Sequence, residues 1–386
     1  ATLDQKTEYG RKNEALQNEF RASSTAFNIW DWTVGAYHGV AFSQTDVLAN
    51  TNIVGQGVFA FGVDIPIDTT TKAIFTHNVI GLGANTDLTI GVRYNNFEQD
   101  AGNVQAGDFL IGSEMLPGGE ITDPIIPPLE NVNPCADGTA APCVLSSSYD
   151  EDKWTGTIKL SHFFGDYLNL YGTLDKGYRP GAPNFDFTGV FSPEFNEFAG
   201  ESVNSFEIGA KGDIFDGRGR YTAAMFYSVY EDYQVQAQFE AYNFVSEEVE
   251  TPSNVPWVNV DEAVQWGIEA DFQMLVTSNW FFYTGFTYTN VEFTDGEIPC
   301  TDPTQPPVGP DNRFNTCDAD GENASAQPEW TANLRSEYTF PQVFGQTDAY
   351  VSGVIAYRGE TEVPGDTTGR LDTDDFTTLD LYTGLR

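Results

Sequence analysis

The feature that most constrains this chain is a repeated two-residue alternation of apolar and polar side chains. One stretch is apolar at every second position from Val264 to Met274, and Gln265, Gly267, Glu269, Asp271 and Gln273 fill the gaps. Successive side chains of a β-strand point to opposite faces, so such a segment predicts a strand with one apolar and one polar face. The pattern recurs along the chain, without sustained heptads.

Counting these segments predicts an all-β chain of about thirteen strands. We place them near residues 5–22, 29–43, 71–84, 86–97, 150–164, 167–178, 203–215, 219–238, 257–276, 279–293, 327–340, 347–358 and 372–386. Several exceed the five or six residues usual in globular sheets.

The predicted connections alternate between short and long. Short ones lie at 83–87, 165–166, 216–219, 277–279 and 341–347, and long ones at 97–149, 178–203, 239–257, 293–327 and 358–372. A soluble sandwich or propeller also alternates apolar and polar residues, but it does not need all its short turns on one side. Outer-membrane barrels do show this asymmetry, with short periplasmic turns and long extracellular loops.

Charge and composition exclude other classes of protein. The chain has 18 basic and 57 acidic residues, for a net charge of −39, which argues against a nucleic-acid binder or a protein attracted to an anionic membrane surface. Aromatic residues make up 14% of the chain, too many for a disordered one. The polar opening ATLDQKTEYG has neither a signal peptide nor an initiator Met, and we expect a processed or partial chain.

We therefore predict a transmembrane antiparallel outer-membrane β-barrel with long extracellular loops, in a Gram-negative bacterium. Six aromatic residues stand near predicted strand ends, where interfacial girdles belong: Tyr94, Trp154, Trp266, Trp280, Tyr288 and Trp330. Bacterial barrels close with even strand numbers, so an odd count predicts that further strands belong at both ends of residues 1–386.

Four cysteines occur as two local pairs in loops rich in Pro, Gly and Asp. Cys135 and Cys143 form one pair, and Cys300 and Cys317 form the other. Four cysteines allow three connectivities, and we favour the two local disulfides over zinc, because the spacings and the lack of a nearby His fit zinc poorly.

An ordered series of motifs resembles the TonB-dependent outer-membrane receptors. Residues 171–185 (YGTLDKGYRPGAPNF) resemble a strand end of that family, and residues 201–218 followed by 223–236 resemble its next hairpin. Residues 264–271 and 328–334, with the upstream segments EFRA and WTVGA, continue the series in order over nearly the whole chain.

The resemblance implies a barrel of about 22 strands plugged by an N-terminal domain. It also implies uptake of a scarce ligand driven by the TonB–ExbB–ExbD complex, which would act through the plug. The chain has neither a plug nor a TonB box, so residues 1–386 are predicted to be a partial barrel domain.

Candidate site residues fall into two groups. The first lies near the strand exit at residue 178 and could line the ligand path: Tyr178, Arg179, Asn184 and Phe185. For Arg179 we favour the alternative of a structural bond to carboxylates in the lumen. The second group is polar and predicted to face the lumen, as ion-pair partners rather than a substrate site: Arg93, Lys159, Glu207, Lys211, Glu269, Asp271, Arg335 and Glu337.

Other chemistries have little support in the sequence. His38, His77 and His162 fall in strands rather than long loops, which disfavours haem, and no catalytic constellation stands out, so we predict no enzyme. No cofactor is required. One segment resembles half a calcium loop, although we favour a metal-free turn there: Asp318, Asp320, Glu322 and Glu329.

The predicted loops are acidic: no Lys or Arg lies between Arg93 and Lys153. Acidic loops around the barrel entrance repel polyanions, so we predict that the ligand is neutral or cationic or that divalent metal ions bridge the loops. The alternative is a saline habitat, in which salt screens the charge. We predict a TonB-energised receptor for a small ligand, most simply an iron–siderophore chelate, seated in outer-membrane lipid. The alternatives are a passive porin or structural barrel, and a soluble β-rich binding protein.

Overall fold

The computed structural model describes residues 3–53, 57–111, 143–184, 197–236, 241–243, 248–250, 257–300, 315–362 and 372–386. Within these ranges the chain forms strands and turns, and thirteen strands make one antiparallel sheet. No helix in the described part of the chain is long and apolar enough to cross a membrane.

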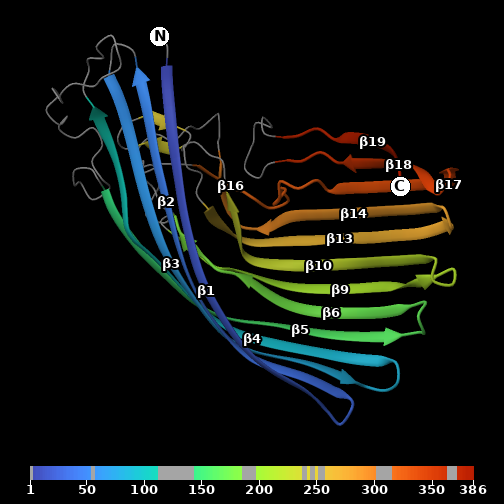
Figure 1. Ribbon diagram of the computed structural model, residues 1–386. Helices are drawn as coiled ribbons and strands as arrows, with labels where there is room; N and C mark the ends of the chain where they lie inside the picture. Colours follow the sequence, from blue (N-terminus) through green and yellow to red (C-terminus); the bar gives the residue numbers. More distant parts are fainter. Residues whose placement is uncertain are drawn as a thin grey trace.

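The main sheet is a meander in which each strand pairs with the next one along the chain (Figure 1). Its strands are β1 (Leu3–Ala26), β2 (Trp30–Ile53), β3 (Gly57–Gly81), β4 (Thr86–Ile111), β5 (Cys143–Phe163), β6 (Asn169–Arg179), β9 (Glu201–Ile214), β10 (Gly219–Gln236), β13 (Trp257–Thr277), β14 (Trp280–Asp295), β17 (Trp330–Phe344), β18 (Thr347–Arg358) and β19 (Phe376–Leu385). Three hairpins stand outside it: β7 (Ala182–Pro183) with β8 (Glu197–Phe198), β11 (Ala241–Asn243) with β12 (Glu248–Glu250), and β15 (Glu297–Cys300) with β16 (Asn315–Asp318).

The thirteen predicted strands are confirmed and most of their ends lie within about four residues of the prediction, but four ends were wrong by more. β2 runs to Ile53 rather than residue 43, β3 begins at Gly57 rather than 71, β4 runs to Ile111 rather than 97, and β5 begins at Cys143 rather than 150. The hydrogen-bond ladder continues through these extensions; for example, Thr45 of β2 pairs with Ile65 of β3. In β2, β4 and β5 the extensions do not keep the apolar/polar alternation, so the periodicity could not reveal them. In β3 the alternation does continue, through Phe59, Phe61, Val63, Ile65 and Ile67, and the sequence analysis overlooked it.

The predicted asymmetry of the connections is present. Tight turns join β1 to β2, β3 to β4, β5 to β6, β9 to β10, β13 to β14 and β17 to β18, and they lie together on one side of the sheet in Figure 1. The β9–β10 turn shows the local reason: Asp216 and Gly217 have φ of 56° and 80°, which these residue types adopt more readily than most. The six remaining connections leave the opposite ends of the strands; five are long, but only residues 54–56 join β2 to β3.

The outward face of the sheet is an apolar wall. One row crosses six strands through paired positions: Ile90, Ile158, Leu174, Phe206, Tyr227 and Trp266. Five of these side chains are exposed, Leu174 to 57%. Exposing such a row to water costs about 25 cal/mol for each Å² of apolar surface, whereas lipid covers it without that cost.

Aromatic side chains border this wall, as the sequence predicted. Tyr94 packs on Trp154 with ring centroids 5.0 Å apart, and Tyr288 lies 5.1 Å from Trp266 and 4.4 Å from Trp330. Nearer the tight turns, the Trp280 indole donates to Ser336 Oγ at 2.9 Å. Amphipathic rings at both edges of an apolar band are typical of the two membrane interfaces.

On the inner face, large rings lie over glycines of the same or the adjoining strands. The Tyr171 ring fills the space that a Cβ of Gly209 would need, and the Phe226 ring does the same at Gly267. Tyr37 over Gly39 and Tyr350 over Gly384 repeat the arrangement. The rings cover backbone that glycine would leave bare, which stabilises a curved sheet.

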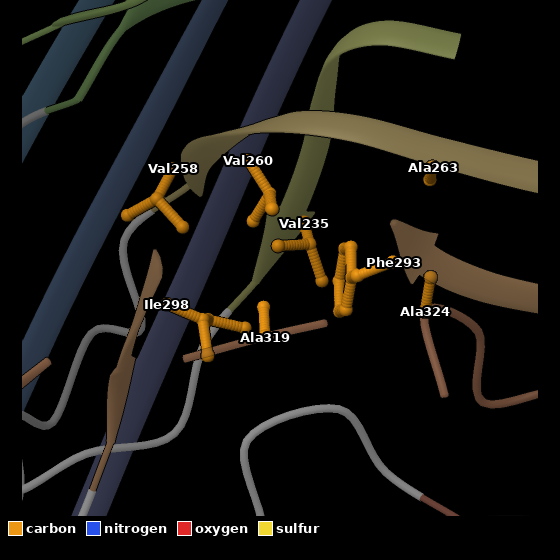
Figure 2. Close-up of a cluster of buried hydrophobic side chains, with 8 residues drawn as sticks. All are labelled: Val235, Val258, Val260, Ala263, Phe293, Ile298, Ala319 and Ala324. Carbon is orange, nitrogen blue, oxygen red and sulfur yellow. The ribbon is translucent and has the colours of Figure 1, made fainter. Parts of the chain in front are cut away.

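A small apolar cluster caps the sheet at the ends of β10, β13 and β14 that lead to long connections (Figure 2). Phe293 lies at its centre, with a side chain 1% exposed, among Val260, Ile298 and Ala324. The Tyr233 ring packs edge-on against Phe293 at 5.8 Å. This cluster docks the β15–β16 hairpin, which the sequence assigned to a loop.

The ring-over-glycine packing makes a prediction. Gly209→Ala should lower the free energy of unfolding by about 1–3 kcal/mol, because a Cβ there displaces the Tyr171 ring. The matched control is Gly172→Ala, where the nearest atom to the new Cβ is the Glu207 carbonyl oxygen at 3.8 Å. Urea unfolding in lipid, followed by tryptophan fluorescence, measures both, and equal losses would contradict the packing argument.

Candidate functional site

Polar side chains gather on the inner face where β6, β9, β10 and β13 meet the long connections. Arg179 ends β6 directly opposite Glu201, which begins β9. The Arg179 guanidinium donates to Glu201 Oε2 at 2.8 Å. The Glu201 side chain is 10% exposed and that of Arg179 is 47% exposed, so the pair lies at the border of a buried region.

Gln234, near the end of β10, ties this pair to the neighbouring backbone. Its side-chain amide donates to the carbonyl oxygens of Pro180 at 3.0 Å and Ala199 at 2.8 Å. Its backbone N–H donates to Glu201 Oε2 at 2.8 Å, and its carbonyl accepts from Arg179 at 3.0 Å. These hydrogen bonds replace those of the β-ladder where the chain leaves and re-enters the sheet, so the buried polar groups keep their partners.

A second set of contacts lies on the β5 side. The Gly200 N–H donates to Tyr149 Oη at 2.9 Å, and the Lys153 ammonium pairs with Glu151 Oε1 at 2.9 Å. Glu151 Oε2 is buried without a hydrogen-bond partner in the part of the chain that the structure describes. A Cβ at Gly200 would meet the Glu151 carboxylate, so any larger residue there would require the Glu151 side chain to move.

Burial and nearby carboxylates raise the pKa of two tyrosines at the ends of the strands that lead to the long connections. Burial, followed by the Glu151 charge, raises the pKa of Tyr149 to about 12. In the Phe293 cluster, burial and the Glu201 charge likewise raise the pKa of Tyr233 to about 12. Both phenols therefore stay neutral at physiological pH.

Aromatic contacts complete the site. The Arg179 guanidinium lies 5.5 Å from the centroid of the Trp257 ring, and Phe198 stacks on that ring at 5.9 Å. Asn184 donates to the Trp257 carbonyl at 2.7 Å and accepts from its N–H at 3.2 Å. These contacts hold the β7–β8 hairpin against the start of β13.

The structure brings Arg179 and Asn184 together, but both are engaged in contacts within the protein. The bond from Arg179 to a carboxylate is the structural role that the sequence analysis favoured. Tyr178 is the adjacent residue of β6. Phe185 lies outside the described residues. A role of these residues in ligand binding stays a prediction.

The predicted lumen residues share the inner face of the wall. Glu207 accepts from the Tyr171 hydroxyl at 2.7 Å, and the Lys159 ammonium lies 4.3 Å from that ring. Asp271 accepts from the Tyr283 hydroxyl at 2.7 Å, in the same row as Lys211. The others are Arg93, stacked on Tyr37 and Phe75, Glu269, paired with Ala224, and Arg335, bonded to Glu337. Lys159 and Glu207 therefore meet at the Tyr171 ring, with Glu269 near enough to act on its hydroxyl, whereas Arg93 and the Arg335–Glu337 pair belong to other strands.

The residues of the suggested calcium loop make turn contacts. Asp318 Oδ1 accepts from the Asp320 N–H at 3.0 Å, and Glu329 Oε1 accepts from Asn290 at 3.4 Å. Glu322 contributes its carbonyl to Phe293. Across the described ranges, no three His, Cys, Asp or Glu side chains are grouped to hold a metal ion.

Among the four cysteines, the structure shows that Cys317 is part of a disulfide bond. In the β15–β16 hairpin Cys317 pairs with Ile298 and Cys300 with Asn315, so the two cysteines are diagonal neighbours. Cys143 begins β5, and Cys135 lies outside the described residues. Both local pairings stay predictions.

The sequence analysis missed Gln234, Tyr149 and Trp257. Gln234 is one polar residue within a strand of alternating pattern, and nothing local marks it as the residue that joins three segments. Glycines in the connections, Gly181 and Gly200, are a usable signal, because each lies where a Cβ would strike a neighbouring element.

Three features define a transmembrane β-barrel protein of the outer-membrane type: an apolar membrane-facing wall, a polar inner face, and connections that are all short on one side and, except between β2 and β3, long on the other. A family model described as TonB dependent receptor-like, beta-barrel matches residues 2–386. The chain therefore belongs to this family of outer-membrane proteins.

Solved structures agree on the fold. The ferric yersiniabactin uptake receptor FyuA from Yersinia pestis aligns with a TM-score of 0.68 at 14% identity, over 98% of this chain and 47% of that receptor. The ferric-catecholate import receptor Fiu from E. coli K12 gives 0.63 at 16% identity, over 98% and 49%. The siderophore receptor PiuA from Acinetobacter baumannii gives 0.55 at 14% identity, over 96% and 58%.

The chain thus spans about half the length of the receptors it resembles. At these identities the likeness concerns the fold alone. No curated protein sequence matches the chain.

The buried carboxylate makes a prediction. Glu201→Gln should lower the free energy of unfolding by about 1–3 kcal/mol, because Arg179 and the Gln234 N–H lose a charged acceptor. The control is Asp213→Asn, which breaks an exposed pair with Arg220 at 2.9 Å and should cost about 1 kcal/mol or less. If the two variants unfold at the same urea concentration, Glu201 is not a structural anchor.

The raised phenol pKa values make another. A phenol whose pKa is raised on folding contributes stability that is intact below its unfolded pKa of about 10 and is lost as pH rises through its folded value. Alkaline titration of the folded protein, followed by tyrosinate absorbance, should show a late group near pH 12. Tyr149→Phe should remove one tyrosine from that late group. If it instead removes one of the tyrosines that titrate near pH 10, the assignment is wrong.

Proposed function

We propose that this protein is the barrel portion of a receptor that takes up a scarce ligand across the outer membrane with energy supplied through TonB. The observation that carries the proposal is the family match over residues 2–386. TonB, with ExbB and ExbD, would act through an N-terminal plug domain of the full-length receptor.

The proposed ligand is a small iron chelate of the siderophore type. Support comes from similar structures, which are receptors for ferric yersiniabactin, ferric catecholate and siderophores. The soluble β-rich alternative does not fit an outward wall of exposed apolar side chains or the family of the chain.

Charge narrows the proposed ligand further. The chain carries a net charge of −39, and its long connections hold many of the carboxylates. A strongly negative mouth lowers the local concentration of polyanions and raises that of cations. The ligand would then be neutral or cationic as its iron complex. A saline habitat remains the alternative reason for such charge.

The test is uptake of radioactive iron by cells that express the full-length receptor and lack other iron-chelate receptors. Neutral, cationic and anionic ferric siderophores are supplied to cells with and without functional TonB. Uptake of a neutral or cationic chelate only when TonB is present is the expected result. Equal uptake without TonB would indicate a passive pore, and no uptake of any chelate would exclude this ligand class.

A further inference from the structure

A hollow of about 430 Å³ opens on the membrane-facing wall over β4, β5, β6 and β9. Its lining is mostly apolar and comes chiefly from two adjacent rows of outward side chains. The row nearer the tight turns contributes Ile90, Ile158, Leu174, Phe206 and Tyr227. A hollow of this size accommodates a small ligand or part of a lipid chain.

The hollow exists because Gly156 interrupts the second row, between Val92 on β4 and Lys176 on β6. A Cβ at Gly156 would approach the Gly91 carbonyl oxygen to 2.8 Å, closer than real Cβ contacts. The close approach of the two strands therefore keeps a side chain out of this position. The gap is a fixed feature of the wall rather than the result of one rotamer.

A single cation stands at the side of the hollow nearer the long connections. Lys176 is exposed, and none of the described residues forms an ion pair or hydrogen bond with its ammonium. Its cross-strand neighbours, Gly156 and Asn204, are uncharged, and the adjacent Asp175 belongs to the inner face by strand alternation. An unpaired cation on the outward wall is unusual in a chain with a net charge of −39.

The depth of Lys176 in the membrane follows from the aromatic border. Tyr94 and Trp154 are paired one row nearer the long connections than Val92 and Gly156. Such ring pairs mark the boundary between hydrocarbon and headgroups, and a lysine just below it extends its ammonium to that boundary. The apolar hollow thus lies at the depth of lipid acyl chains, and the Lys176 ammonium lies at the depth of lipid headgroups.

We propose that this hollow is a binding site for a phosphate-bearing lipid of the surrounding membrane. One acyl chain would lie over Gly156 against Ile158 and Leu174, and the phosphate would meet Lys176 and Asn204. Charge complementarity selects an anionic headgroup over an uncharged one. The site lies on the opposite face of the wall from the lumen, so it is independent of the proposed transport.

The experiment is native mass spectrometry of the full-length protein in detergent, titrated with phosphatidic acid or with diacylglycerol that has the same acyl chains. The wild-type protein should retain one phosphatidic acid at least tenfold more tightly than diacylglycerol. Lys176→Gln should lose that preference, and Lys176→Arg should keep it. The matched control is Lys72→Gln, since Lys72 already pairs with Glu98 at 3.2 Å and should add nothing to lipid retention.

A second variant tests the hollow itself. Val92→Trp places a ring beside Gly156 and should reduce phosphatidic acid retention at least tenfold, while heat-modified gel mobility confirms that the barrel is folded. Equal retention of the two lipids by the wild-type protein would overturn the proposal. So would equal losses in Lys176→Gln and Lys72→Gln, or undiminished retention by a folded Val92→Trp variant.

Discussion

The structure depends on one constraint: a backbone that crosses hydrocarbon must satisfy its own hydrogen bonds. The meander meets it strand by strand, since each of the thirteen strands pairs with its neighbours in sequence. Once the backbone is paired in this way, side chains alternate between two solvents. Lipid receives Leu174 and Phe206, and the inner face receives Glu207 and Asp271. The apolar wall, the aromatic borders and the polar interior all follow from that division.

The two ends of the strands are held by different interactions. Near the tight turns, short connections and rings packed over glycines, such as Tyr171 over Gly209, stabilise the wall locally. At the other end the chain makes long excursions, and contacts between distant segments must hold it. Glu201 and Gln234 do this with buried hydrogen bonds, and Phe293 does it with an apolar cluster. The end proposed to receive the ligand is therefore also the end whose order rests on long-range contacts.

Strands were predictable from the sequence where the surroundings of each side chain determine whether it is apolar or polar. The strand from Trp257 to Thr277 was predictable because lipid on one side and polar surroundings on the other impose a period of two. The same reasoning failed for β4 beyond residue 97, where that period is lost and only the hydrogen-bond ladder continues. It also failed for the β15–β16 hairpin, whose stability comes from packing against Val260 and Phe293 rather than from its own pattern.

By itself the sequence determined the all-β class, the order of the strands, the side of each tight turn and the face of each wall residue, because these depend on local alternation and turn chemistry. It also contained the ordered motifs of the receptor family. Only the tertiary structure decided that Arg179 bonds Glu201, that Gln234 joins β10 to the exits of two other strands, and that Gly156 opens a hollow beside Lys176. Those features arise from register between segments far apart in the chain, and a register is a property of the sheet that no single segment encodes.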